Sequence, residues 1–220
     1  ILKRHGADAM TETADNVAKD LGLSRQDADV YAAGSQQKYE AARAAGFFAG
    51  EILPIEVASG KKGAPPNIVS TDEHPRPNST VDALANLKPL HEGGVTTGGN
   101  ASGVNDGAAV VLLGSKAAGD KAGKKPLARI LAGAAVGVEP RVMGVGPAYA
   151  IPKALERAGL KLSDMDVIEI NEAFASQVLG CLKLLKLPFD DKRVNPNGGA
   201  IAIGAKRWCG WRSCTGAVMT

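Results

Sequence analysis

A polar pair at the end of an apolar run is the first place where this sequence could do chemistry. In "DVIEINEAFASQ", a run typical of a buried strand leads into Asn171 and Glu172, and a helix is predicted to follow. An amide at a helix start can hold a water molecule or an oxyanion, because the helix dipole is positive at that end. The simpler alternative is that Asn171 caps the helix, and this short pattern alone favours the cap.

Two glycine-rich stretches could bring the backbone close to a ligand. "GGNASG" spans residues 98–103 and "NPNGGAIAIG" spans residues 195–204, and glycine allows close approach to phosphate or amide groups. The first stretch has neither the spacing of a dinucleotide-binding loop nor the lysine of a phosphate-binding loop, so a plain turn is the simpler interpretation. In the second stretch, the glycines permit a tight turn or a close contact between strands.

The histidines and cysteines form no recognisable catalytic or metal-binding pattern. Surface or capping roles are expected for the widely separated His5, His74 and His91, and no metal site is predicted. Cys181 falls on the apolar stripe of a predicted helix and is expected in the core. Nearby arginines could lower the pKa of Cys209 or Cys214, but no histidine lies near them in the sequence, so catalysis by these two cysteines is not expected.

Two helices are predicted in the first part of the chain, over residues 11–22 and 25–46. Thr11 or Thr13 is the expected cap of the first helix, which should end at a glycine. Ser24 opens the second helix and is followed three residues later by an acidic residue, as in a capping box.

The later elements alternate between strands and helices. The expected elements are a strand over 51–57, an exposed loop over 59–80, a strand over 127–138, a helix over 146–159, a strand over 166–170 and a helix over 171–187. This alternation predicts an α/β fold with functional residues at strand ends and helix starts. A boundary near residue 93 separates a helical, loop-rich region from the α/β unit.

Composition excludes several classes of protein. The 220 residues are 45% hydrophobic and 22% charged, which argues against disorder, and a net charge of +3 is too small to indicate a nucleic-acid binder. No apolar run is long enough to span a membrane, and the first residues lack the apolar segment of a secretion signal. Three cysteines do not make a disulfide framework, so a reducing, cytoplasmic location is expected.

Read together and in order, six stretches of the chain resemble the thiolase family. They are "MTETADNVAKDLGLSRQDADVYAAGSQQKYEAARAAGFF", "DEHPRPNSTVDALANLKPL", "VTTGGNASGVNDGAAVVLL", "RVMGVGPAYAIPKALERAGL", "EINEAFASQ" and "VNPNGGAIAIG". The "DEHPRP" and "NPNGG" motifs are most similar to those of acetyl-CoA acyltransferases of the β-ketoadipyl-CoA type.

The resemblance implies a layered αβαβα thiolase fold, represented here in part. Residues 1–92 would form the loop domain with the end of the N-terminal half, and residues 93–220 the beginning of the C-terminal half. The implied reaction is reversible Claisen condensation or thiolytic cleavage of a 3-oxoacyl-CoA, with coenzyme A thioesters as substrates and no bound cofactor. A homodimer or homotetramer is implied too, and eukaryotic members of the family occupy peroxisomes and mitochondria.

The resemblance also implies roles for particular residues. Asn171 would hold the water of an oxyanion hole, Ser102 would contact the pantetheine arm, and Arg76 would lie near the nucleotide end of coenzyme A. The tunnel for the acyl chain and pantetheine would be lined by Met10, Met143 and Phe174.

The chain departs from the family pattern at its catalytic positions. The family's acylated cysteine would lie upstream of Ile1 and its second cysteine beyond Thr220, while a family histidine after Gly204 is replaced by Ala205. The basic and aromatic stretch over 205–213 is best explained by a local error in the sequence. A catalytically inactive module that binds coenzyme A is the main alternative, and nucleic-acid binding through "AKRWCGWR" is disfavoured by its short extent.

Overall fold

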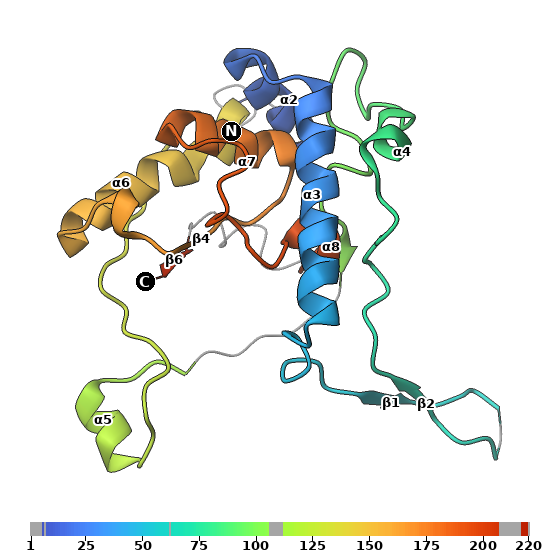
Figure 1. Cartoon of the computed structure of the whole chain (residues 1–220), viewed down its shortest axis with the longest axis vertical. Coiled ribbons are helices and arrows are strands. Elements are labelled where there is room, and N and C mark those ends of the chain that lie inside the picture. The colour runs from blue at the N-terminus through green and yellow to red at the C-terminus, as the bar shows by residue number, and fades with distance from the viewer. Residues whose placement is uncertain (1–5, 7, 62, 106–111, 207–216, 220) are drawn as a thin grey trace.

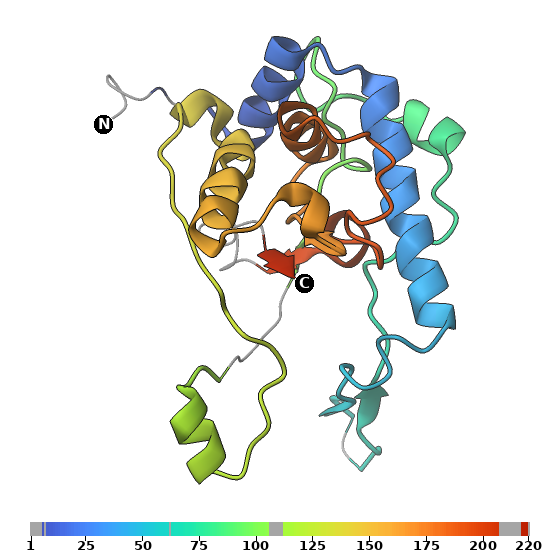
Figure 2. The same ribbon diagram turned by 60° about the vertical axis from the view of Figure 1, so that its left-hand side comes forward.

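The computed structural model describes residues 6, 8–61, 63–105, 112–206 and 217–219. Helices pack around short paired strands to form the main body of the molecule (Figure 1). Two arms project from this body, and both are visible after a turn about the vertical axis (Figure 2). One arm is a hairpin of β1 and β2, and the other carries the short helix α5.

The first two helices follow the sequence closely. α2 covers Met10–Leu21 and α3 covers Arg25–Ala44. Gly22 ends α2 in the left-handed conformation, with φ of 60°, and the Ser24 hydroxyl accepts the N–H of Asp27 at the start of α3. These two predictions are confirmed.

The predicted cap of α2 is wrong. Because the helix begins at Met10, both Thr11 and Thr13 lie inside its first turn. The Thr13 hydroxyl donates to the carbonyl of Met10 at 2.7 Å, and Thr11 Oγ1 lies 2.6 Å from a ring nitrogen of His91. Both threonines therefore use their hydroxyls for contacts other than a cap.

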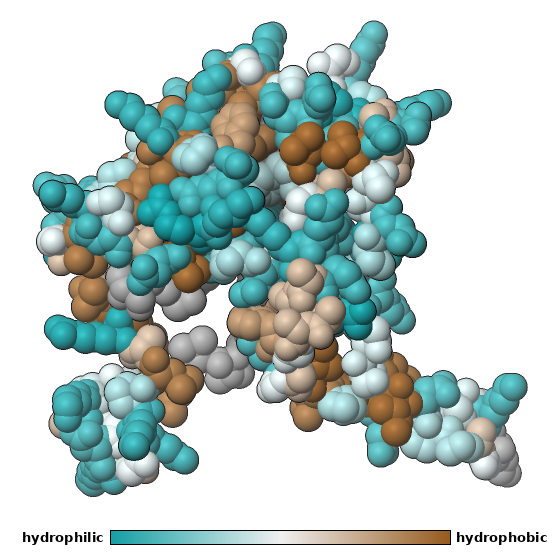
Figure 3. Space-filling view, in the orientation of Figure 1, coloured by the Kyte–Doolittle hydropathy of each residue, from teal (hydrophilic) through white to brown (hydrophobic). Residues whose placement is uncertain are grey.

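The two arms contain the least buried parts of the chain. In the hairpin, β1 (Ile55–Val57) pairs antiparallel with β2 (Asn67–Val69). α4 (Val81–Ala85) follows on the main body, and α5 (Lys116–Lys121) lies on the other arm. Apolar side chains on the arms face solvent (Figure 3), including Leu53 at 76% exposure and Ile130 at 71%.

The predicted strand over 127–138 is wrong, because these residues join no sheet in the structure. A strand needs a neighbouring strand to pair with its backbone N–H and C=O groups. None of the described residues pairs with this segment as a strand. Its apolar sequence favours a strand, but its leucines and isoleucine remain exposed.

The C-terminal elements include one largely buried helix and the elements packed near it. They are η1 (Pro140–Val145), α6 (Gly146–Ala158), η2 (Leu162–Asp164), β4 (Val167–Glu169), α7 (Ala175–Leu185) and α8 (Ala200–Ile203). β4 pairs antiparallel with β6 (Ala217–Met219), and β3 (Val104–Asn105) pairs parallel with β5 (Ala205–Lys206). The predicted helix ending at Gly159 and the predicted strand before Asn171 are both confirmed.

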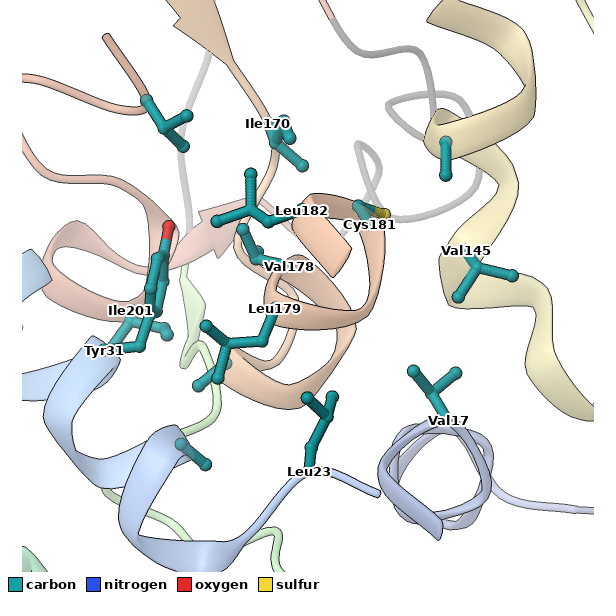
Figure 4. Packing of buried hydrophobic residues seen from close by; sticks show 14 of the residues in the cluster. Val17, Leu23, Tyr31, Val145, Ile170, Val178, Leu179, Cys181, Leu182 and Ile201 are labelled. Atoms are coloured by element: carbon teal, nitrogen blue, oxygen red, sulfur yellow. The ribbon is translucent and has the colours of Figure 1, made fainter. Parts of the chain in front are cut away.

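α7 lies at the centre of the hydrophobic core (Figure 4). Val178, Leu179 and Leu182 are all at most 1% exposed, and burying each contributes roughly 1.5–3 kcal/mol. Cys181 is fully buried among them, as predicted, and its thiol donates to the carbonyl of Gly144 at 3.4 Å. No helix in the described part of the chain is long and apolar enough to cross a bilayer.

Candidate functional site

A small cavity lies where the first residues of α2, the end of η1 and the start of α7 meet. Its volume is about 40 Å³, which is room for roughly two or three water molecules. The residues around it are Met10, Thr13, Ala14, Met143, Gly144, Pro147, Asn171, Ala173, Phe174 and Gln177. The wall is mostly apolar, with a few hydroxyl and amide groups and no charged side chain.

The structure brings together residues that are far apart in the sequence. Met10, Met143, Asn171 and Phe174 all line this cavity. The helix-cap interpretation of Asn171 is wrong, because α7 begins at Ala175 and its cap position is Phe174. Asn171 lies in the segment that joins β4 to the helix, beside the cavity rather than at a cap.

Ser102 follows a turn at residues 98–99 and lies directly alongside this segment. The Ser102 N–H donates to the carbonyl of Ala173 at 3.0 Å, and Ala101 forms an antiparallel bridge with Phe174. Residues 98–103 and the "NEAF" segment are therefore neighbours, joined through backbone hydrogen bonds.

The half-buried Asp15 and the buried Asn100 fix the loop that leads into this turn. Asp15 Oδ1 accepts the N–H groups of Val95 and Thr96, both at 2.9 Å. Asn100 accepts the Thr97 N–H at 2.8 Å and donates to the carbonyl of Val95 at 2.9 Å. The loop is therefore held by side-chain contacts as well as by its own turns, which fixes Ser102 relative to α7.

Arg76 lies away from the cavity. It is exposed, its backbone N–H donates to Gln36 Oε1 at 2.8 Å, and its Nη1 donates to the carbonyls of Glu73 and His74, both at 2.9 Å. Its predicted contact with a nucleotide remains a prediction. A ring nitrogen of His74 lies 3.3 Å from the carbonyl of Ile201, a contact between segments 127 residues apart.

A second group of buried polar side chains surrounds Glu172, which is 1% exposed. Glu172 Oε1 accepts from the Tyr31 hydroxyl at 2.9 Å and from Asn195 Nδ2 at 3.0 Å. Glu172 Oε2 accepts from the Ser35 hydroxyl at 2.6 Å and from the Ile201 N–H at 3.1 Å. Each carboxylate oxygen therefore has two donors, which offsets the cost of burying the group.

The electrostatics of this group agree with its hydrogen bonding. Burial, together with the neighbouring Glu172 carboxylate, raises the pKa of Tyr31 well above its ordinary value of 10.0. Tyr31 thus remains a neutral hydroxyl donor. Burial also raises the pKa of Glu169 and lowers that of Lys38, which are both partly buried nearby.

The glycines of "NPNGG" allow the 195–201 loop to approach α3 and Glu172 closely. A Cβ on Gly199 would lie 2.5 Å from Glu172 Cδ. Gly198 has φ of 78°, and a Cβ there would lie 2.6 Å from the carbonyl oxygen of Ser35. Of the two predicted roles, the tight turn is confirmed, since the Gly198 N–H donates to the carbonyl of Asn195 at 3.1 Å. The predicted close contact between strands is wrong, because the neighbour is helix α3.

Several cavity residues were not identified from the sequence, although helix periodicity pointed to them. Thr13 and Ala14 follow Met10 by three and four residues on α2, and Gln177 follows Phe174 by three. Gln177 Oε1 is buried without a hydrogen-bond partner among the described residues. The group around Glu172 was also missed, because its members come from three separate segments.

Some predictions fall outside the described residues. They concern His5, Cys209, Cys214 and the basic and aromatic stretch from 207 onward. Among the residues that the structure does describe, no three His, Cys, Asp or Glu side chains are grouped as metal ligands would be.

Family models match nearly the whole chain. The "Thiolase, N-terminal domain" model matches residues 2–117, and the "Thiolase, C-terminal domain" model matches residues 124–215. A β-ketoadipyl-CoA thiolase from Pseudomonas putida is 55% identical over 202 residues, which is 91% of this chain and 50% of that protein.

Solved structures resemble the same chain. The human mitochondrial 3-ketoacyl-CoA thiolase in complex with CoA has a TM-score of 0.81 at 44% identity, covering 89% of this chain and 47% of that one. The dimeric peroxisomal thiolase of Saccharomyces cerevisiae has a TM-score of 0.81 at 45% identity, covering 90% and 48%. The chain spans about half the length of the relatives it matches, and within that span its α/β fold is the thiolase fold. The chain belongs to the thiolase family.

Proposed function

We propose that this chain forms part of an acyl-CoA:acetyl-CoA C-acyltransferase, which carries out reversible Claisen condensation or thiolytic cleavage of a 3-oxoacyl-CoA. The observation that supports this most is the cavity where Met10, Met143, Asn171 and Phe174 meet. At about 40 Å³ the cavity has room only for small groups, so it is proposed to be one part of the substrate tunnel. Its apolar wall suits an acyl chain that passes beside it, and its few amides and hydroxyls suit the neutral, polar pantetheine arm.

Asn171 is the proposed oxyanion residue. The cavity beside it has room for a water molecule, and an amide can orient that water toward a developing negative oxygen. Ser102 and Arg76 remain proposed contacts of pantetheine and of the nucleotide end of coenzyme A. By family resemblance, acyl transfer and proton transfer are carried out by two cysteines, and none of the three cysteines of this chain matches either of them. Cys181 is buried in the core and is not part of the cavity wall.

The substrate is proposed to be a coenzyme A thioester with acetyl-CoA as a partner or product, without a resident cofactor. The Pseudomonas putida relative is named for β-ketoadipyl-CoA, and a human relative was solved with CoA. Residues 1–92 and 93–220 are the proposed loop domain and C-terminal unit. A cytoplasmic location is part of the same proposal, with peroxisomes or mitochondria for a eukaryotic source.

A homodimer or homotetramer is proposed as well. The exposed apolar residues of the arms, such as Leu53 and Ile130, favour association, since large exposed apolar areas are unusual on monomers. The yeast relative is described as dimeric. Size-exclusion chromatography with light scattering should give a mass at least twice that of the chain, and a sharp monomer peak would contradict the proposal.

The function is tested on the whole protein of which this chain is proposed to form part. The purified protein is incubated with 3-oxoadipyl-CoA and coenzyme A, and acetyl-CoA is quantified by mass spectrometry. Turnover in the wild type, with a loss of about 10²- to 10³-fold in Asn171→Ala, is the expected result. CoA binding without turnover would favour the alternative, an inactive CoA-binding module. Failure to bind CoA, measured by calorimetry, would refute both.

A further inference from the structure

Glu172 is a buried carboxylate that the proposed chemistry does not use. It lies next to Asn171 in the chain, but the two side chains lie in different surroundings. Asn171 lines the cavity, whereas Glu172 is 1% exposed and bonded to α3 and the 195–201 loop.

The backbone on both sides of Asn171 is held in place by hydrogen bonds. On one side, the Ile170 N–H donates to Asn195 Oδ1 and the Ile170 carbonyl accepts from Asn195 Nδ2, both at 2.8 Å. On the other side, the Ala173 carbonyl accepts the Ser102 N–H at 3.0 Å. Between these two points, the Glu172 carboxylate accepts a hydrogen bond from Asn195. It also accepts hydrogen bonds from Tyr31, Ser35 and the Ile201 N–H, which tie the segment to its neighbours.

We propose that Glu172 is a positioning residue, which fixes Asn171 in the cavity wall by tying its segment to α3 and to the 195–201 loop. The inference rests on the proposed function, because it takes Asn171 to be the residue that holds the oxyanion water. Glu172 itself does not touch the substrate, and its effect reaches the reaction only through the position of Asn171.

Glutamine is the informative replacement at this position, because it keeps the size of glutamate. Oε1 and Oε2 each accept one N–H donor, from Asn195 and from the Ile201 backbone respectively. Whichever oxygen becomes an NH2 group, one N–H will then face another N–H. The Tyr31 and Ser35 hydroxyls can rotate to adapt, but these two N–H donors cannot.

A double-mutant cycle between Glu172→Gln and Asn171→Ala, made in the whole protein of which this chain is proposed to form part, tests the proposal by turnover. We expect Glu172→Gln to lower kcat about 10- to 100-fold with little change in KM, since misplacement of a catalytic group has effects of this size. In the Asn171→Ala background, the same change should have no further effect. An equal loss in both backgrounds would overturn the inference. A fully active Asn171→Ala would instead refute the proposed function.

Ser24→Ala is the matched control, because it removes the cap of the same helix α3 at an exposed position away from the cavity. It should lower stability by about 1 kcal/mol and leave kcat unchanged. If Glu172→Gln does not fold, Tyr31→Phe removes one donor to the carboxylate and should lower kcat in the same Asn171-dependent way. A Tyr31→Phe loss that persists in Asn171→Ala would overturn the inference.

A spectroscopic measurement tests the positioning without any turnover. In ¹⁵N-labelled protein, the side-chain amide of Asn171 should give one sharp pair of signals in the wild type and in Ser24→Ala. In Glu172→Gln or Tyr31→Phe, these signals should shift or broaden. Unchanged Asn171 signals in both variants would show that Glu172 does not position this side chain.

Discussion

Gly198→Ala should cause a large loss of stability, because the glycine meets two separate constraints. Its φ of 78° is unfavourable for alanine, at roughly 1–2 kcal/mol. Its added Cβ would also lie 2.6 Å from the carbonyl oxygen of Ser35 and 2.8 Å from the backbone nitrogen of Tyr39. Both atoms belong to the backbone of α3, which cannot move aside easily, and such overpacking costs about 1–3 kcal/mol.

Gly22→Ala separates the two contributions. Gly22 has a similar φ of 60°, but a Cβ there would meet no atom within 4 Å. Alanine at this position should therefore cost only the conformational part, about 1–2 kcal/mol, whereas Gly198→Ala should cost about 2–5 kcal/mol. Urea denaturation followed by circular dichroism measures both, provided that the m-values stay equal. Equal losses in the two variants would refute the close packing of the 195–201 loop on α3.

Two further predictions concern the cavity and the start of α3. Gly144→Ala places a Cβ 2.6 Å from Gln177 Cγ, so it should weaken acetyl-CoA binding measured by calorimetry, whereas Gly146→Ala, with no atom closer than 4.0 Å, should bind like the wild type. The Ser24 hydroxyl lowers the pKa of Asp27 below 3.8, so the stability that this contact contributes is present above pH 3.8 and is lost as the pH falls through the lower folded-state pKa. Asp27→Asn should therefore flatten the acid limb of the stability curve, and an unchanged limb would contradict this assignment.

The local elements could be predicted where the signal lay within a few residues. Ser24 and Gly22 mark helix ends through their own backbone and side-chain chemistry, and the structure agrees with both. The prediction of a strand over 127–138 was wrong because a strand depends on a pairing partner, which the local sequence does not specify. A strong β pattern therefore led to a wrong assignment there.

The candidate site was only partly predictable. Family resemblance identified Met10, Met143, Asn171 and Phe174, which line one cavity. The surroundings of Glu172 could not be predicted from spacing, because its donors Tyr31 and Ser35 lie 141 and 137 residues away in the chain. Such long-range polar contacts depend on how helices pack rather than on any local pattern.

Methionine methyl NMR tests the central claim most directly, which is that the cavity beside Asn171 binds the coenzyme A thioester. The chain has four methionines, of which Met10 and Met143 line the cavity and Met165 is 2% exposed in the core. On titration with acetyl-CoA, the ¹³C-methyl signals of Met10 and Met143 should shift together and saturate, while that of Met165 stays in place. Saturable binding without a shift of Met10 or Met143 would place the ligand elsewhere and contradict the claim.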